Sequence, residues 1–160
     1  MVSALSPPIL KRVTLWVRDL ERSLALYRDI LELSVIEEKT LQGAAIARMV
    51  GLEEARLRIV HLGTPNSESG WIGLYEISET APRPMGALAV PREFPLYGQS
   101  TIVLECRDLL AVHARLAAFP EVRILAGPTS YEKPEGIFRE LIFLDPDGIP
   151  VSVLSFTPVG

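Results

Sequence analysis

The side chains that could bind a metal ion or transfer a proton are few and widely spaced in this sequence. The candidates are two histidines and three glutamates: His61, His113, Glu76, Glu105 and Glu140. Imidazole and carboxylate groups are common ligands of Zn, Ni, Mn and Fe(II), and they also serve as general acids and bases. The sequence holds no His-x-His or His-x-x-x-His pair, so the fold would have to assemble a site from His61 and two glutamates.

Three of the reactive side chains also have purely structural interpretations. His61 lies in an alternating stretch typical of a strand, which favours a histidine hydrogen-bonded to a neighbour over a metal ligand. His113 is expected on a helix as a packed or rim residue. Cys106 falls on the apolar face of an expected strand, which favours a buried, unreactive thiol over a nucleophile. The chain has no second cysteine, which excludes an internal disulfide.

A short pattern that occurs twice organises the chain. Residues 12–20 read Arg-Val-Thr-Leu-Trp-Val-Arg-Asp-Leu, and residues 101–109 read Thr-Ile-Val-Leu-Glu-Cys-Arg-Asp-Leu. Each copy alternates between two faces as a strand does and then continues into a helically spaced apolar stripe. Asp19 and Asp108 are expected to cap the two helices with their carboxylates. The repeat predicts two similar half-domains.

The pattern that follows extends each half to strand, helix and three further strands. In the first half we expect strands at 12–18, 33–40, 56–62 and 71–77, an inserted loop with a helical turn at 43–54, and a turn at 65–70. In the second half we expect strands at 101–106, 137–144, 149–156 and near 121–126, with a type I turn at Asp145–Gly148. Four prolines within residues 80–97 indicate a linker. We therefore predict a single domain over 1–160: module one at about 10–78, a linker at 79–97, and module two at about 98–157.

Composition excludes several classes of function. The 160 residues carry a net charge of −4 and a hydrophobic fraction of 48%, which is ample for a packed core. The sequence has no basic stripe, so nucleic acid is not an expected partner. Residues 1–8 do not resemble a secretory signal, and no apolar run is long enough to span a bilayer. The expected location is therefore the cytoplasm, without a membrane partner.

These patterns resemble the vicinal oxygen chelate superfamily, which includes glyoxalase I, bleomycin-resistance proteins and extradiol dioxygenases. The resemblance rests on residues 13–20, on Tyr27-Arg-Asp-Ile-Leu-Glu-Leu33 and on the late Asp145-Pro-Asp-Gly148, and it covers nearly the whole chain. It implies an α+β fold in which two βαβββ modules curve into a cup-shaped sheet. In the metal-dependent members, ligands from the first and last strand of each module hold a divalent ion.

At the four positions that match those ligands, this sequence holds Arg12, Gly73, Thr101 and Ser152. An arginine is a permanent cation, a glycine has no side chain, and single hydroxyls are weak ligands. Glu76 is an alternative equivalent of the first module's last-strand ligand, which would leave one carboxylate. We therefore expect no metal and no other cofactor, with a divalent metal at a displaced site as the alternative.

Strand alternation identifies the residues that would line the cup. They share the face of the former ligand positions, and the set is mainly apolar and aromatic with one cation and one anion, as small-molecule sites are. The expected binding residues are Arg12, Thr14, Trp16, Trp71, Gly73, Tyr75, Thr101, Val103, Glu105, Ser152, Leu154 and Phe156.

Several of these residues have two interpretations. Arg12 either binds a carboxylate or phosphate of the ligand, or pairs with Glu105 and fills the place of the metal. Trp16, Trp71 and Tyr75 either stack on a planar ligand, or belong to the core or to a dimer surface.

Three hypotheses of function remain open at this stage. The first is a metal-free protein that binds and sequesters a small molecule, like the bleomycin-resistance proteins, and forms a homodimer. The second is an enzyme of glyoxalase, epimerase or dioxygenase type with displaced or no metal; a cofactor-free version would use Glu105 as base and Arg12 as electrostatic stabiliser. The third is a module with a filled cup that serves assembly or regulation.

Overall fold

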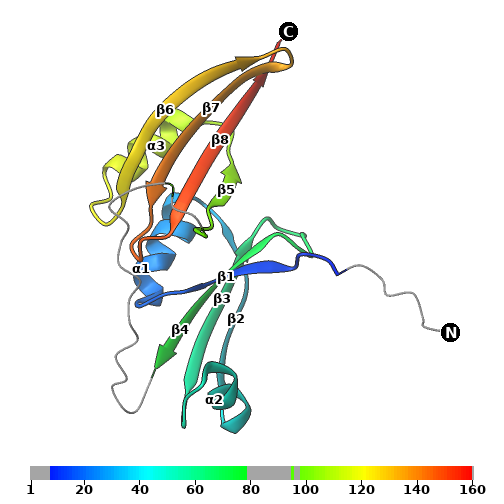
Figure 1. The fold of residues 1–160 in the computed structure, drawn as a ribbon, viewed down its shortest axis with the longest axis vertical. Helices are drawn as coiled ribbons and strands as arrows, with labels where there is room; N and C mark the ends of the chain where they lie inside the picture. The colour runs from blue at the N-terminus through cyan, green and yellow to red at the C-terminus, as the bar shows by residue number, and fades with distance from the viewer. Residues whose placement is uncertain (1–7, 79–94, 96–97, 160) are drawn as a thin grey trace, which may run out of the picture. The chain divides into compact units, whose positions relative to one another are not determined.

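The structure is a computed structural model that describes residues 8–78, 95 and 98–159. The chain divides into two compact units, Met1–Arg83 and Pro84–Gly160, and each contains one four-stranded mixed sheet. The two units have the same order of elements, apart from an additional short helix in the first, as Figure 1 shows by label and colour. The expected α+β class with two βαβββ modules is confirmed.

The first unit has its sheet in the order β1-β4-β3-β2. β1 (Arg12–Trp16) runs parallel to β4 (Trp71–Ser78), whereas β3 (Arg56–Gly63) runs antiparallel to both β4 and β2 (Ser34–Gln42). The helices of this unit are α1 (Leu20–Leu24), the π-helical stretch η1 (Ala25–Ile30) and α2 (Ala44–Val50). The last lies within the segment expected as an insertion.

The second unit repeats this topology with the order β5-β8-β7-β6. β5 (Ile102–Glu105) runs parallel to β8 (Pro150–Pro158), and β7 (Gly136–Leu144) runs antiparallel to β8 and to β6 (Arg123–Lys133). Helix α3 (Leu109–Ala117) follows β5. β6 is longer than the strand expected near 121–126, because the β6–β7 hairpin continues pairing as far as Lys133 opposite Gly136.

The aspartate of each repeated Arg-Asp-Leu begins a helix, as expected. Asp19 Oδ1 accepts a hydrogen bond from the Arg22 N–H at 3.0 Å, and Asp108 Oδ1 accepts one from the Ala111 N–H at 2.9 Å. Each carboxylate thereby satisfies one of the N–H groups that the first helical turn leaves free.

The first helix differs from a regular α-helix after Leu24. The Leu31 N–H donates to the carbonyl of Leu26, five residues earlier, which is the π-helical pattern. The extra residue in the turn brings both Leu26 and Tyr27 into the core, where each is 0% exposed. Of the apolar stripe that we expect after Asp19, Leu20, Leu24 and Tyr27 are buried, and Leu31 at the end of the helix is half-buried.

The two faces of the first sheet are covered differently. Leu15, Leu62 and Leu74 are buried on the face that carries α1, and Glu76 on the same face accepts the backbone N–H of Leu20 at 2.9 Å. The opposite face holds a separate cluster of Leu57, Ile59 and Tyr75, and the Ile46 side chain of α2 packs against it. The inserted helix thus fills one end of the face that the sequence assigns to the cup (Figure 1).

The core of the second unit lies between its sheet and α3, where Leu116, Leu141, Phe143, Val151 and Val153 are buried. The turn that joins β7 to β8 is held by Asp145. Its backbone carbonyl accepts the Gly148 N–H, and its Oδ1 accepts the N–H groups of Asp147 and Ile149. This agrees with the turn expected at Asp145–Gly148.

Part of the expected organisation lies outside the described residues. Of the linker predicted at 79–97, the structure describes residue 95 alone, and it does not describe residues 1–7. Within the described ranges, no helix combines the length and apolar character that crossing a membrane requires.

Candidate functional site

Four strands of the first unit bring one residue each into a single row across the sheet. Thr14 on β1 is opposite Gly73 on β4, Gly73 is opposite His61 on β3, and His61 is opposite Glu37 on β2. The row lies on the face opposite α1, next to Tyr75, which is two residues after Gly73 on the same strand. This face is the candidate site in the first unit.

A β-bulge aims Glu37 at this row. The pairing of β2 with β3 shifts between Val35, opposite Leu62, and Glu37, opposite His61. Without the shift, Val35 and Glu37 would project from the same face of the sheet, because strand residues two apart do so. The bulge separates them and places the Glu37 carboxylate beside the imidazole of His61.

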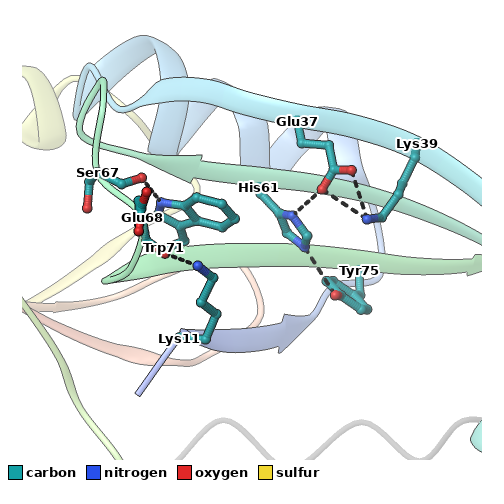
Figure 2. A network of polar contacts seen from close by, with 8 residues as sticks. All are labelled: Lys11, Glu37, Lys39, His61, Ser67, Glu68, Trp71 and Tyr75. Atoms are coloured by element: carbon teal, nitrogen blue, oxygen red, sulfur yellow. Dashed lines mark hydrogen bonds and ion pairs between the residues drawn. The ribbon is translucent and has the colours of Figure 1, made fainter. Parts of the chain in front are cut away.

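His61 is hydrogen-bonded at both ring nitrogens (Figure 2). Nδ1 lies 2.9 Å from Glu37 Oε2, and Nε2 lies 3.1 Å from the Tyr75 hydroxyl oxygen. A carboxylate only accepts hydrogen bonds, so Nδ1 carries the proton and Nε2 accepts the Tyr75 O–H. Lys39 binds both oxygens of Glu37 at 2.9 Å. The result is a directed chain from the Tyr75 hydroxyl through His61 to a carboxylate.

Electrostatics favour a neutral His61 beside a charged Glu37. His61 is 1% exposed, and this burial lowers the pKa of the imidazole below its usual value; the charges of Arg12 and Lys39 add to this, while the hydrogen bond to Glu37 opposes it. The hydrogen bonds from Lys39 and His61 lower the pKa of the Glu37 carboxyl.

Gly73 makes room for this arrangement. A Cβ atom at position 73 would lie 2.8 Å from Tyr75 Cε1 and 3.2 Å from His61 Cδ2, closer than side-chain atoms normally approach. The space in front of Gly73, where the resemblance implies a ligand side chain, is therefore taken by the Tyr75 ring and the His61 imidazole.

Arg12 and Trp16 surround the Tyr75 ring from β1. The Arg12 guanidinium carbon lies 5.8 Å from the Tyr75 ring centre, and the Trp16 ring meets the same ring edge-on at 5.4 Å. Trp16 remains 48% exposed. One cation and one partly open indole thus flank a buried phenol, and a planar ligand could stack on the open part of Trp16.

Trp71 is held more tightly than Trp16. Its Nε1–H donates to the carbonyl of Ser67 at 2.9 Å, and the ammonium of Lys11 lies 5.0 Å from its ring centre. A Cβ at Gly63 would lie 2.8 Å from the Trp71 ring, so this glycine leaves room for the indole. The indole ring centre is 5.8 Å from that of His61 (Figure 2). These contacts fix the position of Trp71 beside His61, and its role in binding stays a prediction.

The second unit carries its own set of expected residues. Val103 is opposite Ser152, and Glu105 is opposite Leu154. The hydroxyl of Ser152, which is buried, donates to Glu140 Oε1 on the neighbouring strand. Val103 is 57% exposed, and Thr101 and Glu105 are also exposed. Ser152 therefore has a carboxylate partner that the expected list did not contain.

A row of aromatic rings continues from these residues along the same face. Phe138 stacks on Tyr131 with ring centres 5.5 Å apart, and its ring centre is 4.7 Å from that of Phe156. The ammonium of Lys133 lies 4.6 Å from the Phe138 ring centre. Of these rings, sequence alternation identified only Phe156.

The remaining candidates are placed elsewhere. Glu76 projects from the face that carries α1, where Leu20 and Arg58 bind it, so it is not the equivalent of Gly73. Cys106 is half-buried, and burial raises the pKa of its thiol. His113 is half-buried on α3. The pairing of Arg12 with Glu105 would join the two units and stays a prediction.

The metal-ligand types do not gather in the part of the chain that the structure describes. Among those residues there is no group of three or more His, Cys, Asp or Glu side chains that could hold an ion. The sequence suggested an alternative site formed by His61 and two glutamates. In the structure, His61 is hydrogen-bonded to one glutamate, Glu37, which was not among the candidates from the sequence. The signal for Glu37 is the bulge, which an alternating pattern does not reveal.

Comparison with known proteins identifies the family. The family model described as the Glyoxalase/Bleomycin resistance protein/Dioxygenase superfamily matches residues 9–153, and the chain belongs to this superfamily. No curated protein sequence matches the chain.

Several solved structures share the fold at low sequence identity. A glyoxalase family protein from Bacillus cereus aligns with a TM-score of 0.77 and 15% identity over 98% of both chains. TnmS3, described as an antibiotic binding protein from Streptomyces, aligns at 0.54 and 16% over 96% of this chain and 100% of its own. The fosfomycin resistance protein FosX from Listeria monocytogenes, in a complex with Mn(II), aligns at 0.53 and 19% over 98% and 95%.

The packing in front of Gly73 leads to a first prediction. In Gly73→Ala the new methyl group would push the Tyr75 ring away from His61, and the cost of such overpacking is about 1–3 kcal/mol of unfolding free energy. The measurement is chemical denaturation of the two proteins. Gly127→Ala is the matched control, because a Cβ there has nothing within 4 Å. Equal stability of Gly73→Ala and Gly127→Ala would contradict the close packing.

A second prediction concerns pH. The folded protein holds the pKa of His61 below the usual value, so the unfolded chain binds the proton first, and unfolding free energy falls as the pH drops below about 6.5. The loss continues down to the lower pKa of the folded state. Denaturation curves at several pH values above about 5, where most carboxylates stay ionised, measure this slope.

His61→Gln should flatten that slope, whereas His113→Gln should preserve it. The absolute stability of His61→Gln can differ from that of the native chain, so only the dependence on pH is compared. A slope that persists in His61→Gln would assign the effect to another group.

Proposed function

We propose that this member of the superfamily is a metal-independent protein that binds a small, planar, anionic molecule. The observation that carries the proposal is the arrangement around Tyr75. Arg12 and the partly exposed Trp16 lie against the Tyr75 ring. The rings of Tyr75 and His61 fill the space in front of Gly73. The arrangement offers a cation and an aromatic surface, and it offers no free metal ligand at that position.

The residues present do not fit the divalent ion of the metal-dependent relatives. At position 73 the place of a ligand side chain is filled by Tyr75 and His61. Ser152 has its hydroxyl on Glu140, and Arg12 is a permanent cation that repels a metal ion. The Mn(II) of the FosX complex therefore has no counterpart in the site that we propose.

The chemistry of the face selects the class of ligand. A guanidinium binds carboxylate or phosphate groups through paired N–H donors, and an open indole stacks on a planar ring. TnmS3, which shares the fold and is described as an antibiotic binding protein, supports a binding role. We propose separately that the second unit carries a binding surface of its own, which includes the exposed residues Thr101, Val103 and Glu105, with Leu154 opposite Glu105.

An enzyme with displaced or no metal is the second candidate. It is favoured by the hydrogen-bonded chain of Tyr75, His61 and Glu37, which has the order of hydroxyl, imidazole and carboxylate found in sites that move protons. In this candidate Arg12 would stabilise a developing negative charge, and Glu105 remains the alternative base.

The metal-independent proposal predicts that no ion is retained. Protein exposed to Ni, Zn, Mn and Fe(II) and then desalted should hold far less than one equivalent of any of them, as measured by mass spectrometry. Near-stoichiometric metal would contradict the proposal and would make the enzyme candidate the leading one.

The ligand class leads to a prediction for Arg12. Naphthoate, a planar carboxylate, should bind to the native protein about tenfold more tightly than to Arg12→Gln, because one charge-assisted contact contributes about 1.5 kcal/mol. Equilibrium dialysis measures both affinities. The uncharged naphthamide should bind the two proteins alike, and Arg107→Gln on the second unit should behave as the native chain. Equal binding of naphthoate by native protein and Arg12→Gln would remove Arg12 from the site.

We further propose a cytoplasmic homodimer. Each sheet ends in two outer strands, β1 and β2 in the first unit and β5 and β6 in the second, and outer strands invite pairing or cover. Sedimentation velocity should give the mass of two chains, and a monomer at all concentrations would contradict the dimer.

A further inference from the structure

Ligand binding alone does not account for a histidine buried between a phenol and a carboxylate. A polar group loses its water on burial, and the cost is recovered only if each of its hydrogen bonds is made in the protein. Both ring nitrogens of His61 are hydrogen-bonded, Nδ1 to Glu37 at 2.9 Å and Nε2 to Tyr75 at 3.1 Å. Three strands and a bulge are needed to hold this chain together, whereas an apolar side chain would fill the same space.

The order of the three groups defines a direction for a proton. The Tyr75 hydroxyl donates to the free lone pair of Nε2, and the Nδ1 proton of the same ring points at Glu37 (Figure 2). A third group that holds the far nitrogen fixes the tautomer and supports the imidazolium that forms when Nε2 accepts a proton. His61 is thus placed to act as a base that receives a proton by way of the Tyr75 hydroxyl.

Burial is the main cause that lowers the pKa of His61, and the charges around the ring act on it in both directions. Arg12 from β1 and Lys39 from β2 disfavour a second cation at this place, and Glu37 from β2 favours it. Tyr75 from β4 is the remaining titratable group in contact. A negative charge that forms on a bound molecule beside Arg12 would offset the repulsion and allow the imidazole to take up a proton.

We propose that Tyr75, His61 and Glu37 form a proton-accepting site for a weakly acidic hydroxyl, a phenol or an enol, of the molecule bound beside Trp16 and Arg12. This inference rests on the proposed function and goes further, because it makes the bound species an anion that the protein itself generates.

The proton transfer balances within the site. The ligand O–H bond breaks and its proton passes to the Tyr75 oxygen, while the original Tyr75 proton passes to His61 Nε2. The imidazolium keeps its Nδ1–H on Glu37, and the ligand remains as a phenolate or enolate near the Arg12 guanidinium. O–H and N–H bonds alone change, so no oxidant, reductant or metal takes part.

The test uses para-nitrophenol as the probe, because its neutral and ionised forms absorb at different wavelengths. At a pH below the pKa of the free probe, binding to the native protein should convert the bound fraction to the phenolate spectrum. Equilibrium dialysis measures the bound amount separately. Tyr75→Phe and His61→Gln should still bind the probe, with a phenolate-to-phenol ratio at least tenfold lower.

Controls and outcomes separate this inference from the proposed function. Tyr131→Phe and His113→Gln change the same residue types in the second unit and should match the native spectrum. Glu37→Gln alters a half-exposed side chain and should lower the ratio even if His61→Gln fails to fold. Probe that binds but stays neutral overturns this inference alone, as does an unchanged ratio in Tyr75→Phe. Absence of binding to the native protein overturns the inference together with the proposed function.

Discussion

The hydrogen bond between the Tyr75 hydroxyl and His61 Nε2, made across Gly73, determines the character of the first unit. A side chain at position 73 would occupy the space of both rings, so this hydrogen bond depends on a glycine at that position. With the bond in place, His61 is buried and neutral, Glu37 is drawn to its far nitrogen, and the Tyr75 ring is held where Arg12 and Trp16 can pack against it. The two rings thereby occupy the space in front of position 73.

The inserted helix α2 packs against the cluster that contains Tyr75. Ile46 closes the cluster of Leu57, Ile59 and Tyr75 on the end of the face beyond His61, so the Tyr75 ring has an apolar side against α2 and a polar end at His61. A phenol held in this way has little rotational freedom, and its hydroxyl is directed to a single acceptor. The first unit therefore combines a filled cluster on β3 and β4 with the partly exposed Trp16, which lies opposite Tyr75 on the neighbouring strand β1.

The repeated Arg-Asp-Leu pattern made the two modules, their helix caps and most strand positions predictable from the sequence. Alternation also placed Arg12, Thr14 and Trp16 on the face of Gly73. The role of Glu37 was not predictable, because a bulge between residues 35 and 37 reverses the alternation on which such a prediction depends. The π-helical turn at η1 was not predictable for a similar reason: one added residue in a helical turn buries a further side chain, Leu26, without changing the apolar composition. Tyr75 was found as a lining residue, but its bond to His61 joins two strands and cannot be read from either one.

Both tryptophans, Trp16 and Trp71, lie on strands of the first unit. The second unit has none, so the intrinsic indole emission of the protein reports on the surroundings of β1 and β4 alone. Far-ultraviolet dichroism, in contrast, follows both sheets. Indole fluorescence therefore follows the first unit alone. Comparing the two signals during unfolding would show whether the repeated modules unfold together or in succession.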